Sequence, residues 1–316
     1  MNEVGTKVVA FGGGHGLAAT LTALRDVTPN ITAVVTVADN GGSSGKIRSE
    51  FNFLPPGDLR MALAALCSAD SWGQGWAQTI QHRFTSEGEL NGHALGNLLL
   101  AALWDSSDDL VAGIDRVGEL LKIVGRVLPM SLQPLDIEGI FTTSTGKEVV
   151  RGQIEVATAK GKLNSLQLLP NNPEVTPQVL QAVADADWLT FGPGSWFSSV
   201  MPHFLLSELS KAISKSAAKK IMIFNLPDPE GADEFAGSTP EEHLELVLAH
   251  SPNFRFDVAI ADPAILSQGN RLENLVERCG GKLVVAEVSK ISDKNHHDPV
   301  KMSSLLSHIF GATLLR

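Results

Sequence analysis

The chain has 316 residues, of which 43% are hydrophobic and 19% charged, so it can bury a sizeable core and global disorder is excluded. Its formal net charge of −10 excludes a general binder of nucleic-acid backbones, although a local basic pocket for one phosphorylated ligand remains compatible with it. The N-terminus lacks the basic and apolar regions of a signal peptide, and no apolar run is long enough to span a membrane. We therefore expect a cytoplasmic protein, in which the two distant cysteines, Cys67 and Cys279, stay reduced.

The first elements in the chain form a strand–helix–strand pattern. Residues 7–11 and 31–38 are short apolar runs typical of buried strands, and residues 16–27 between them carry apolar side chains at helical spacing. Such a βαβ unit predicts a parallel sheet with a right-handed crossover.

The next part of the chain is mainly helical in pattern. Residues 55–67 begin with two prolines and carry Asp58 as an N-cap or first-turn residue, and further helices are predicted over 72–84, 93–104 and 110–124. Residues 139–162 alternate apolar and polar side chains around a turn at 144–146, which predicts a hairpin. We expect a smaller α+β lobe over about 105–184.

The α/β pattern then returns. A strand, a glycine turn and a helix are predicted over 187–206, and further strands over 219–225, 256–262 and 282–288. Ser238 with Glu241 predicts a capping box at the start of the helix over 238–250. The polar segment 289–301 is predicted to be a surface loop, and its adjacent His296 and His297 are weak evidence for a metal site.

These elements predict one α/β domain spanning 1–316. Its Rossmann-like core, over about 1–104 and 185–290, would hold a mostly parallel sheet with helices on both faces. The smaller lobe is inserted in this core, and a C-terminal helix follows over about 298–310.

The stretch FGGGHGLAA, residues 11–19, carries the first ligand-binding signal. Gly14, Gly16 and Ala19 fit the dinucleotide fingerprint G-x-G-x-x-G/A after a strand and at the start of a helix. Without side chains at Gly13, Gly14 and Gly16, a phosphate can approach backbone N–H groups at the helix N-terminus. The alternative is a tight strand-to-helix turn, but three consecutive glycines exceed what a turn needs.

The stretch VTVADNGGSSGKIR, residues 35–48, carries the second signal. Asp39 lies 20 residues after Ala19 and ends a strand, where dinucleotide enzymes place the acid that binds ribose. The glycines, serines and two cations that follow indicate a second anion or sugar cradle. Two alternatives stay open: Asp39 with Asn40 could bind Mg²⁺ together with phosphate oxygens, or the segment could be a solvated turn.

Three further features would add to the site. Residues 191–199, FGPGSWFSS, place another helix start near Ser195 at the carboxyl edge of the sheet. His93 and Asn97 are four residues apart, on one face of a predicted helix. Asn225 ends another predicted strand.

The chain resembles the gluconeogenesis factor (YvcK-like) family and, more distantly, the 2-phospho-L-lactate transferases (CofD) of the same fold group. The blocks that carry the resemblance run over nearly the whole chain, in the family's order: GGGHGL, VTVADNGGSSGKIR, PPGDLR, GHALGN, LPMS and FGPGSWFSSVMPHFL. His15 resembles the actinobacterial branch, where many relatives carry threonine.

The resemblance implies a cytoplasmic, regulatory protein that binds a nucleotide sugar, chiefly UDP-N-acetylglucosamine. It links the protein to growth on gluconeogenic carbon and, through peptidoglycan synthesis, to cell shape. It implies no catalytic residue, no metal and no required cofactor. By position, the implied ligand-binding residues are Gly13, Gly14, His15, Gly16, Asp39, Asn40, Gly41, Ser43, Ser44, Arg48, Asn97, Gly192, Gly194, Ser195 and Asn225.

The chain departs from the family pattern at three places. It has Asn40 where the family has a second acid, Lys46 where the family has arginine, and a different sequence over 225–233. The first alternative function is a Mg²⁺-dependent transferase of the CofD type. The first change, at Asn40, weakens the argument for that function. The second alternative is an NAD(P)-dependent oxidoreductase. The dinucleotide fingerprint supports it, but the chain has no tyrosine and so no acid/base site of the Tyr-x-x-x-Lys kind. No nucleic-acid partner is expected, whereas a homodimer and cell-wall synthesis proteins are left open as partners.

Overall fold

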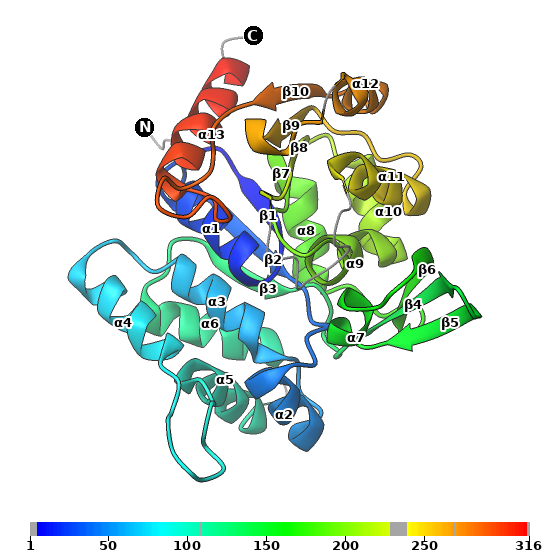
Figure 1. Cartoon of the computed structure of the whole chain (residues 1–316). Helices are drawn as coiled ribbons and strands as arrows, with labels where there is room; N and C mark the ends of the chain where they lie inside the picture. Colours follow the sequence, from blue (N-terminus) through cyan, green and yellow to red (C-terminus); the bar gives the residue numbers. More distant parts are fainter. Residues whose placement is uncertain (1–4, 108, 228–238, 268, 315–316) are drawn as a thin grey trace.

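The computed structural model describes residues 5–107, 109–227, 239–267 and 269–314 (Figure 1). Its centre is a seven-stranded sheet in the order β10-β9-β8-β7-β1-β2-β3, and all the pairs in it are parallel. The strands are β1 (Val8–Gly12), β2 (Ile31–Val35), β3 (Arg126–Pro129), β7 (Trp188–Phe191), β8 (Lys219–Ile223), β9 (Val258–Ala261) and β10 (Lys282–Val285).

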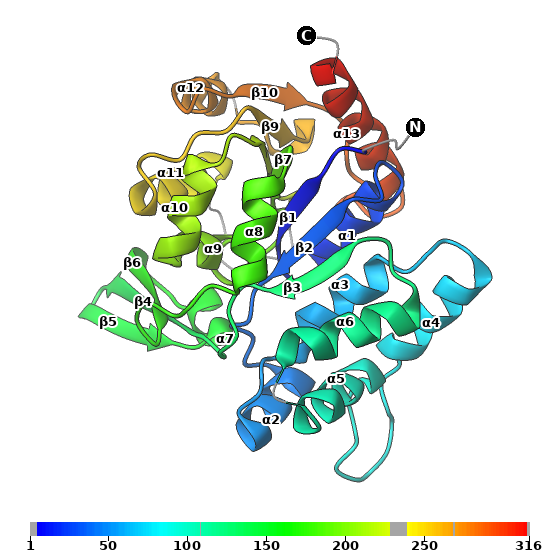
Figure 2. The same cartoon turned by 180° about the vertical axis from the view of Figure 1, so that it is seen from behind.

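Helices cover both faces of this sheet (Figures 1 and 2). On one face, α1 (Gly14–Arg25) contacts β1 and β2, with α3 (Pro56–Ala65) and α13 (Pro299–Leu314) packed against it. On the other face lie α8 (Pro177–Asp185), α9 (Met201–Leu205) and α10 (Ser207–Lys215). The expected α/β class, with a mostly parallel sheet covered on both faces, is confirmed.

The remaining helices lie around the ends and edges of the sheet. Beside β3, α4, α5 and α6 pack around α3, whereas α11 and α12 accompany the strands at the other edge. Their bounds are α2 (Gly42–Phe51), α4 (Ser71–Gln81), α5 (Leu95–Asp105), α6 (Leu110–Leu121), α7 (Gln153–Ala157), α11 (Pro240–His250) and α12 (Arg271–Arg278), with single turns at Trp196–Val200 and Pro263–Ile265.

The strands form here because their apolar, largely β-branched side chains are buried on both faces of the sheet. All five residues of β1 and all four of β7 are buried. Phe11 on β1 stacks on Phe191 of β7 with ring centroids 4.9 Å apart, which ties the two strands through their side chains.

The strand order reverses between β1 and β7. From β1 the chain proceeds outward to β2, whereas from β7 it proceeds in the opposite direction to β8 and β9. Because crossovers are right-handed, the helices after β1 and β7 lie on opposite faces, and the loops that leave these two strands diverge. Such a switch point opens a crevice at the carboxyl ends of the strands, which is where α/β proteins bind ligands.

The smaller lobe is shorter than expected. A three-stranded antiparallel sheet, β5-β4-β6, comprises β4 (Asp136–Thr143), β5 (Gly146–Arg151) and β6 (Lys162–Leu169). The hairpin at residues 144–146 is confirmed. The lobe does not extend over 105–184, because β3 belongs to the main sheet and α8 packs on that sheet. β3 is the next element after α6 and carries no glycine turn after it, so its short apolar run was not separated from the neighbouring elements in the sequence.

Two local predictions were wrong. The segment predicted as a glycine-serine loop after Asp39 is mostly helix α2, which begins at Gly42. The capping box of α11 consists of Thr239 and Glu242, one residue later than predicted, and Ser238 lies outside the described residues. Among the described residues, no helix combines the length and apolarity needed to cross a membrane.

Candidate functional site

A cleft of about 980 Å³ opens at the switch point between β1 and β7. One wall is the start of α1, and the opposite wall is the turn after β7. Residues from α3, α4, α11 and the 289–299 segment complete it. Of the residues predicted to bind ligand, His15, Gly16, Gly194, Ser195 and Asn225 line this cleft.

The cleft lining has an unusual charge. The chain carries a net charge of −10, yet none of the described residues that line the cleft is aspartate or glutamate. The lining instead includes Lys290 and four histidines, His15, His243, His296 and His297. Asp293, outside the lining, pairs with His296 at 2.7 Å. Burial lowers the pKa values of His15, His243 and His297, so these three side chains carry little charge at pH 7. The wall is compatible with an anionic ligand because its described lining includes Lys290 and no acidic side chain.

The glycines of the first motif serve close packing as well as ligand access. A Cβ on Gly16 would lie 2.2 Å from the carbonyl oxygen of Pro193, so only glycine lets α1 approach the turn after β7. Gly14 has φ of +56°, and a Cβ there would lie 4.0 Å from Oδ1 of Asp58. Gly13, the N-cap residue of α1, has no side chain to cap the helix, and the Asp58 carboxylate accepts a hydrogen bond from the Gly14 backbone. Of this helix start, His15 and Gly16 line the cleft, where the helix N-terminus favours an anion.

The turn after β7 is held by Asn225. Its Oδ1 accepts a hydrogen bond from the Gly194 backbone N–H at 2.8 Å, and its Nδ2 donates to the Gly194 carbonyl oxygen at 3.0 Å. Ser195 accepts a hydrogen bond from the Ser198 backbone N–H at 3.1 Å and caps the following helical turn. These contacts give Asn225 and Ser195 a structural part in shaping the cleft wall, and their contact with ligand stays a prediction.

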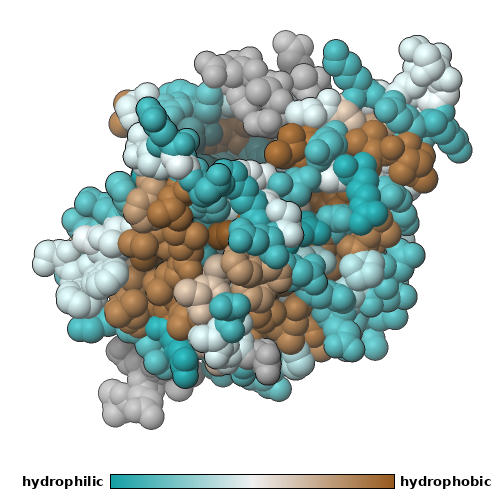
Figure 3. Space-filling view, turned by 90° about the horizontal axis from the view of Figure 1, so that it is seen from below, coloured by the Kyte–Doolittle hydropathy of each residue, from teal (hydrophilic) through white to brown (hydrophobic). Residues whose placement is uncertain are grey.

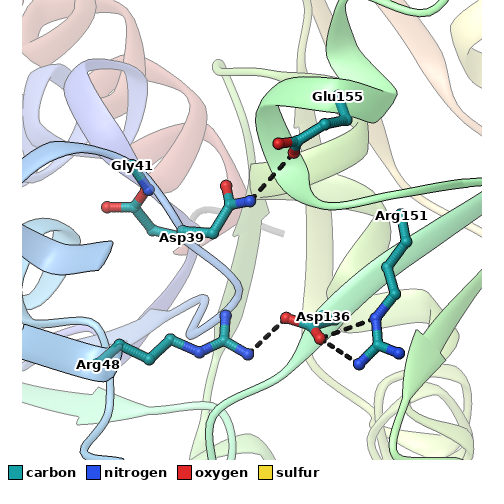
Figure 4. Close-up of polar contacts among 7 residues, drawn as sticks. Asp39, Gly41, Arg48, Asp136, Arg151 and Glu155 are labelled. Carbon is teal, nitrogen blue, oxygen red and sulfur yellow. Dashed lines mark hydrogen bonds and ion pairs between the residues drawn. The ribbon is translucent and has the colours of Figure 1, made fainter. Parts of the chain in front are cut away.

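A second group of predicted residues lies at the start of α2, against the smaller lobe (Figure 4). The Oδ1 of Asp39 accepts a hydrogen bond from the Gly41 backbone N–H at 2.9 Å, and the Nδ2 of Asn40 donates to Glu155 at 3.0 Å. Arg48 forms an ion pair with Asp136, which also pairs with Arg151. The Asp39–Gly41 segment is thus tied to both α2 and the lobe.

Some polar atoms of this group are unused. Asn40 Oδ1 and Arg48 Nη1 are buried without a hydrogen-bond partner in the described parts of the chain. Since a buried polar atom without a partner is costly, both atoms are candidates for contact with a polar ligand.

Three other predicted ligand residues bond inside the protein. Asn97 Nδ2 donates to Ser43 Oγ at 3.0 Å, and this hydroxyl also lies 3.0 Å from Nδ1 of His93. Ser44 Oγ accepts a hydrogen bond from the Gly57 backbone N–H at 3.0 Å. These bonds connect α2 to α5 and α3. Ser43, Ser44 and Asn97 do not line the 980 Å³ cleft, and whether they touch a ligand stays a prediction.

The sequence prediction missed the functional candidate Asp58, which was taken only as a helix-start residue. Its carboxylate lies beneath the α1 turn, where Thr36 Oγ1 is 3.5 Å away and the Gly14 backbone donates a hydrogen bond. Burial, and next the charge of Asp39, raise the pKa of Asp58 to about 7. Asp39 and Asp58, called the carboxylate pair below, therefore interact through their charges.

The second missed candidate is Arg60, two residues further along α3. Only 4% of this residue is exposed, and burial, with the nearby positive charge of Arg83, lowers its pKa to about 10. The available signal was two charged residues within the otherwise apolar helix PGDLRMALAA. A charge on such a helix is costly unless it is paired or functional.

The carboxylate pair bears on metal binding. In the described residues, no cluster of three or more histidine, cysteine, aspartate or glutamate side chains could hold a metal. Mg²⁺, however, uses only one or two protein carboxylates and completes its shell with water and phosphate oxygens. Asp39 and Asp58 fit that donor chemistry, whereas Asn40 is turned toward Glu155.

A second hollow, of about 660 Å³, lies between α2 and α5. Phe51 and Leu90, which are 45% and 52% exposed, line it together with Leu98. Figure 3 shows apolar side chains gathered on this side of the molecule. Of the residues singled out in the sequence, only Lys46 and His93 line this hollow, whereas five of the implied ligand-binding residues line the larger cleft, so we place the candidate site there.

Known proteins resemble the chain over most of its length. Residues 8–296 match the family described as 2-phospho-L-lactate transferase CofD. A Mycobacterium tuberculosis protein named as a gluconeogenesis factor is 42% identical over 309 residues, which cover 96% of this chain and 90% of the relative. The gluconeogenesis factor of Halalkalibacterium halodurans is 37% identical over 244 residues, which cover 77% of this chain and 73% of the relative.

A solved structure supports the same relationship. The crystal structure of a UPF0052 family member from Bacillus halodurans superposes with a TM-score of 0.83 at 30% identity, over 96% of this chain and 98% of that one. The expected resemblance, including that to actinobacterial relatives, is confirmed. The chain belongs to the CofD family, within which its relatives are named gluconeogenesis factors.

Proposed function

We propose that the protein is a regulatory protein that binds a nucleotide sugar, UDP-N-acetylglucosamine, in the cleft at the switch point. The observation that carries this proposal is the cleft wall without described acidic residues, in a chain with a net charge of −10. Its volume of about 980 Å³ lies in the range of small-molecule sites.

The parts of the cleft match the parts of such a ligand. The start of α1 at His15 and Gly16, together with the turn at Pro193, Gly194 and Ser195, would bind the diphosphate. Asp39 and Asn40 do not line the cleft itself. In this proposal they extend the site, with Asp39 accepting hydrogen bonds from ribose hydroxyls and Oδ1 of Asn40 binding a sugar hydroxyl. We extend this proposal to a role in gluconeogenic growth, in line with the names of the relatives, and to a role in cell shape, which follows from the resemblance alone.

Saturation with UDP-N-acetylglucosamine is expected to stabilise the folded protein. At about 100 times the dissociation constant, ligand binding adds about 2.7 kcal/mol to the free energy of unfolding, which raises the melting temperature by about 2–4 °C. A thermal-shift series with this ligand, UDP, GTP with Mg²⁺, and NAD measures the effect. A shift with NAD and none with any uridine nucleotide would favour the oxidoreductase alternative.

The carboxylate pair supports a second candidate, a Mg²⁺-dependent transferase of the CofD type. Such an enzyme transfers a phosphorylated carboxylic acid from a nucleotide carrier to an alcohol. In this candidate, Asp58 would supply the second carboxylate that position 40 lacks. The charge of Asp39 adds to burial in raising the pKa of Asp58. A bound Mg²⁺ would neutralise charge on the transferred phosphate, and the two carboxylates would hold and orient the ion.

The substitution Asp39→Ala is expected to weaken binding of UDP-N-acetylglucosamine by about 1.5–3 kcal/mol, because hydrogen bonds from ribose to a charged carboxylate are lost. Calorimetric titration measures the loss, and Asp26→Ala, which removes an exposed acid of the other end of α1, is the matched control. The folded protein should persist, since Asp39 is partly exposed and its bond to Gly41 lies within one turn.

Titration with and without a chelator separates the two candidates. If the protein is a regulatory binding protein, a chelator leaves the binding of UDP-N-acetylglucosamine unchanged, and chromatography recovers this ligand intact. Metal-dependent turnover of a nucleotide-linked substrate that disappears in Asp39→Asn would establish the transferase instead.

A further inference from the structure

Arg60 is a buried cation whose hydrogen-bonding capacity the protein leaves unused. Its Nε and Nη1 are buried and have no hydrogen-bond partner among the residues that the structure describes. Only 4% of the residue is exposed, so bulk solvent reaches very little of it. A guanidinium buried in this way destabilises the folded protein unless another molecule supplies the acceptors.

The surrounding backbone makes room for this side chain. A Cβ on Gly96 at the start of α5 would lie 2.8 Å from Cγ of Arg60, so glycine is what allows the arginine stem to pass. No side chain caps the N-terminus of α5, and no acidic residue lies in its first turn. Arg60 thus lies against an uncapped helix start, which carries partial positive charge.

The charged groups near Arg60 do not neutralise it through direct bonds. Asp39 and Asp58 are close enough to attract it electrostatically, and Arg83 and His15 are close enough to repel it. Asp58 instead bonds the Gly14 backbone and Thr36, and Arg83 donates to the Gly92 carbonyl oxygen at 2.9 Å. Arg60 and Arg83 are therefore the positive charges of this group, since burial lowers the pKa of His15, and they lie near the carboxylates of Asp39 and Asp58.

We propose that Arg60 binds a phosphate group of a small ligand, beside the α1 N-terminus and the Asp39–Asp58 pair. Phosphate oxygens accept hydrogen bonds from both edges of a guanidinium, and such bonds would supply acceptors for the unpartnered Nε and Nη1 of Arg60. This inference rests on the proposed function in that it assigns a cation to the same phosphorylated ligand, although Arg60 is not among the residues that line the 980 Å³ cleft. The phosphate belongs either to the nucleotide diphosphate or to a separate phosphorylated molecule.

The test uses the full chain and inorganic phosphate as the probe. Calorimetric titration should show phosphate binding to the unsubstituted protein, at least about tenfold weaker binding to Arg60→Met, and an intermediate loss in Arg60→Lys, which keeps the charge but not the fork. Arg116→Met, which removes an exposed arginine of α6, is the control and should bind phosphate normally.

Thermal denaturation without phosphate provides a readout that a structural arginine would not give. Because Arg60 has no partner at two of its donors, Arg60→Met should keep or raise the melting temperature of the ligand-free protein while losing the phosphate-induced shift. If Arg60→Met does not fold, the melting temperature and the phosphate-induced shift of Arg60→Lys are compared with those of the unsubstituted protein instead. Phosphate binding that is absent in the unsubstituted protein, or equal in all three proteins, would overturn the inference.

UDP-N-acetylglucosamine distinguishes the source of the phosphate and separates this inference from the proposed function. Equal weakening of its binding in Arg60→Met assigns Arg60 to the nucleotide diphosphate. Unchanged binding, with phosphate binding lost, assigns Arg60 to a separate phosphorylated molecule. If the unsubstituted protein binds phosphate through Arg60 but no nucleotide sugar, the proposed function fails and this inference stands.

Discussion

Replacing Gly16 by alanine is expected to lower the free energy of unfolding by about 3 kcal/mol, since the new methyl group overlaps backbone atoms that cannot rotate away. The Cβ would lie 2.2 Å from the carbonyl oxygen of Pro193 and 2.7 Å from Cα of Gly194. Relief of this overlap requires α1 and the turn after β7 to separate. Urea denaturation followed by circular dichroism measures the loss.

The matched control is Gly75→Ala on α4. A Cβ at Gly75 meets no atom within 4 Å and the residue lies within a helix, so alanine should leave stability unchanged or raise it by up to about 1 kcal/mol. Any Gly16→Ala protein that folds should also bind the cleft ligand more weakly, because both walls of the cleft shift. Full stability of Gly16→Ala would show that the helix and the turn are not in close contact.

Acidification from pH 7 to pH 4 is expected to lower the free energy of unfolding by about 3 kcal/mol through His203 alone. His203 is fully buried against Phe11, and burial lowers its pKa to about 3. The unfolded chain binds a proton at this residue below about pH 6.5, whereas the folded protein does not. Its contribution to stability is therefore complete above pH 6.5 and is lost as the pH falls toward 3.

The variant His203→Gln tests this, because glutamine stays neutral throughout. The difference in the free energy of unfolding between pH 7 and pH 4 should be smaller in His203→Gln than in the unsubstituted protein, whatever the constant cost of the substitution. His308→Gln, at an exposed position on α13, should not change that difference. An equal pH dependence in all three proteins would show that His203 is protonated in the folded state.

Two other buried histidines add to this acid sensitivity, and one carboxyl group opposes it. Burial lowers the pKa values of His243 and His297 to about 4. The raised pKa of Asp58, about 7, acts in the opposite direction, since its contribution is complete below about pH 3.8 and is lost as the pH rises through 7. Comparison of variants at the same pH cancels the effect of Asp58.

The sequence by itself determined the parallel α/β core, because each of its elements carries a local signal. Residues 7–11, 31–38 and 219–225 are apolar runs that only a sheet covered on both faces can bury. Gly13, Gly14 and Gly16 after the first strand marked the start of a helix that faces a crevice. The turn after β7, at Gly192–Ser195, was recognisable because it also has glycines between a strand and a helix start.

The tertiary structure decided which of these residues share a site. The hydroxyl groups of Ser43 and Ser44 appear in sequence as ligand groups, but in the fold they connect α2 to its neighbours because α5 and α3 pack against it. Asp58 and Arg60 appear in sequence as ordinary helix residues. They become functional candidates only because α3 places one carboxylate beside Asp39 and one arginine in a buried position without partners. Burial and charge proximity depend on contacts between distant segments, which neither hydrophobic periodicity nor motif spacing encodes.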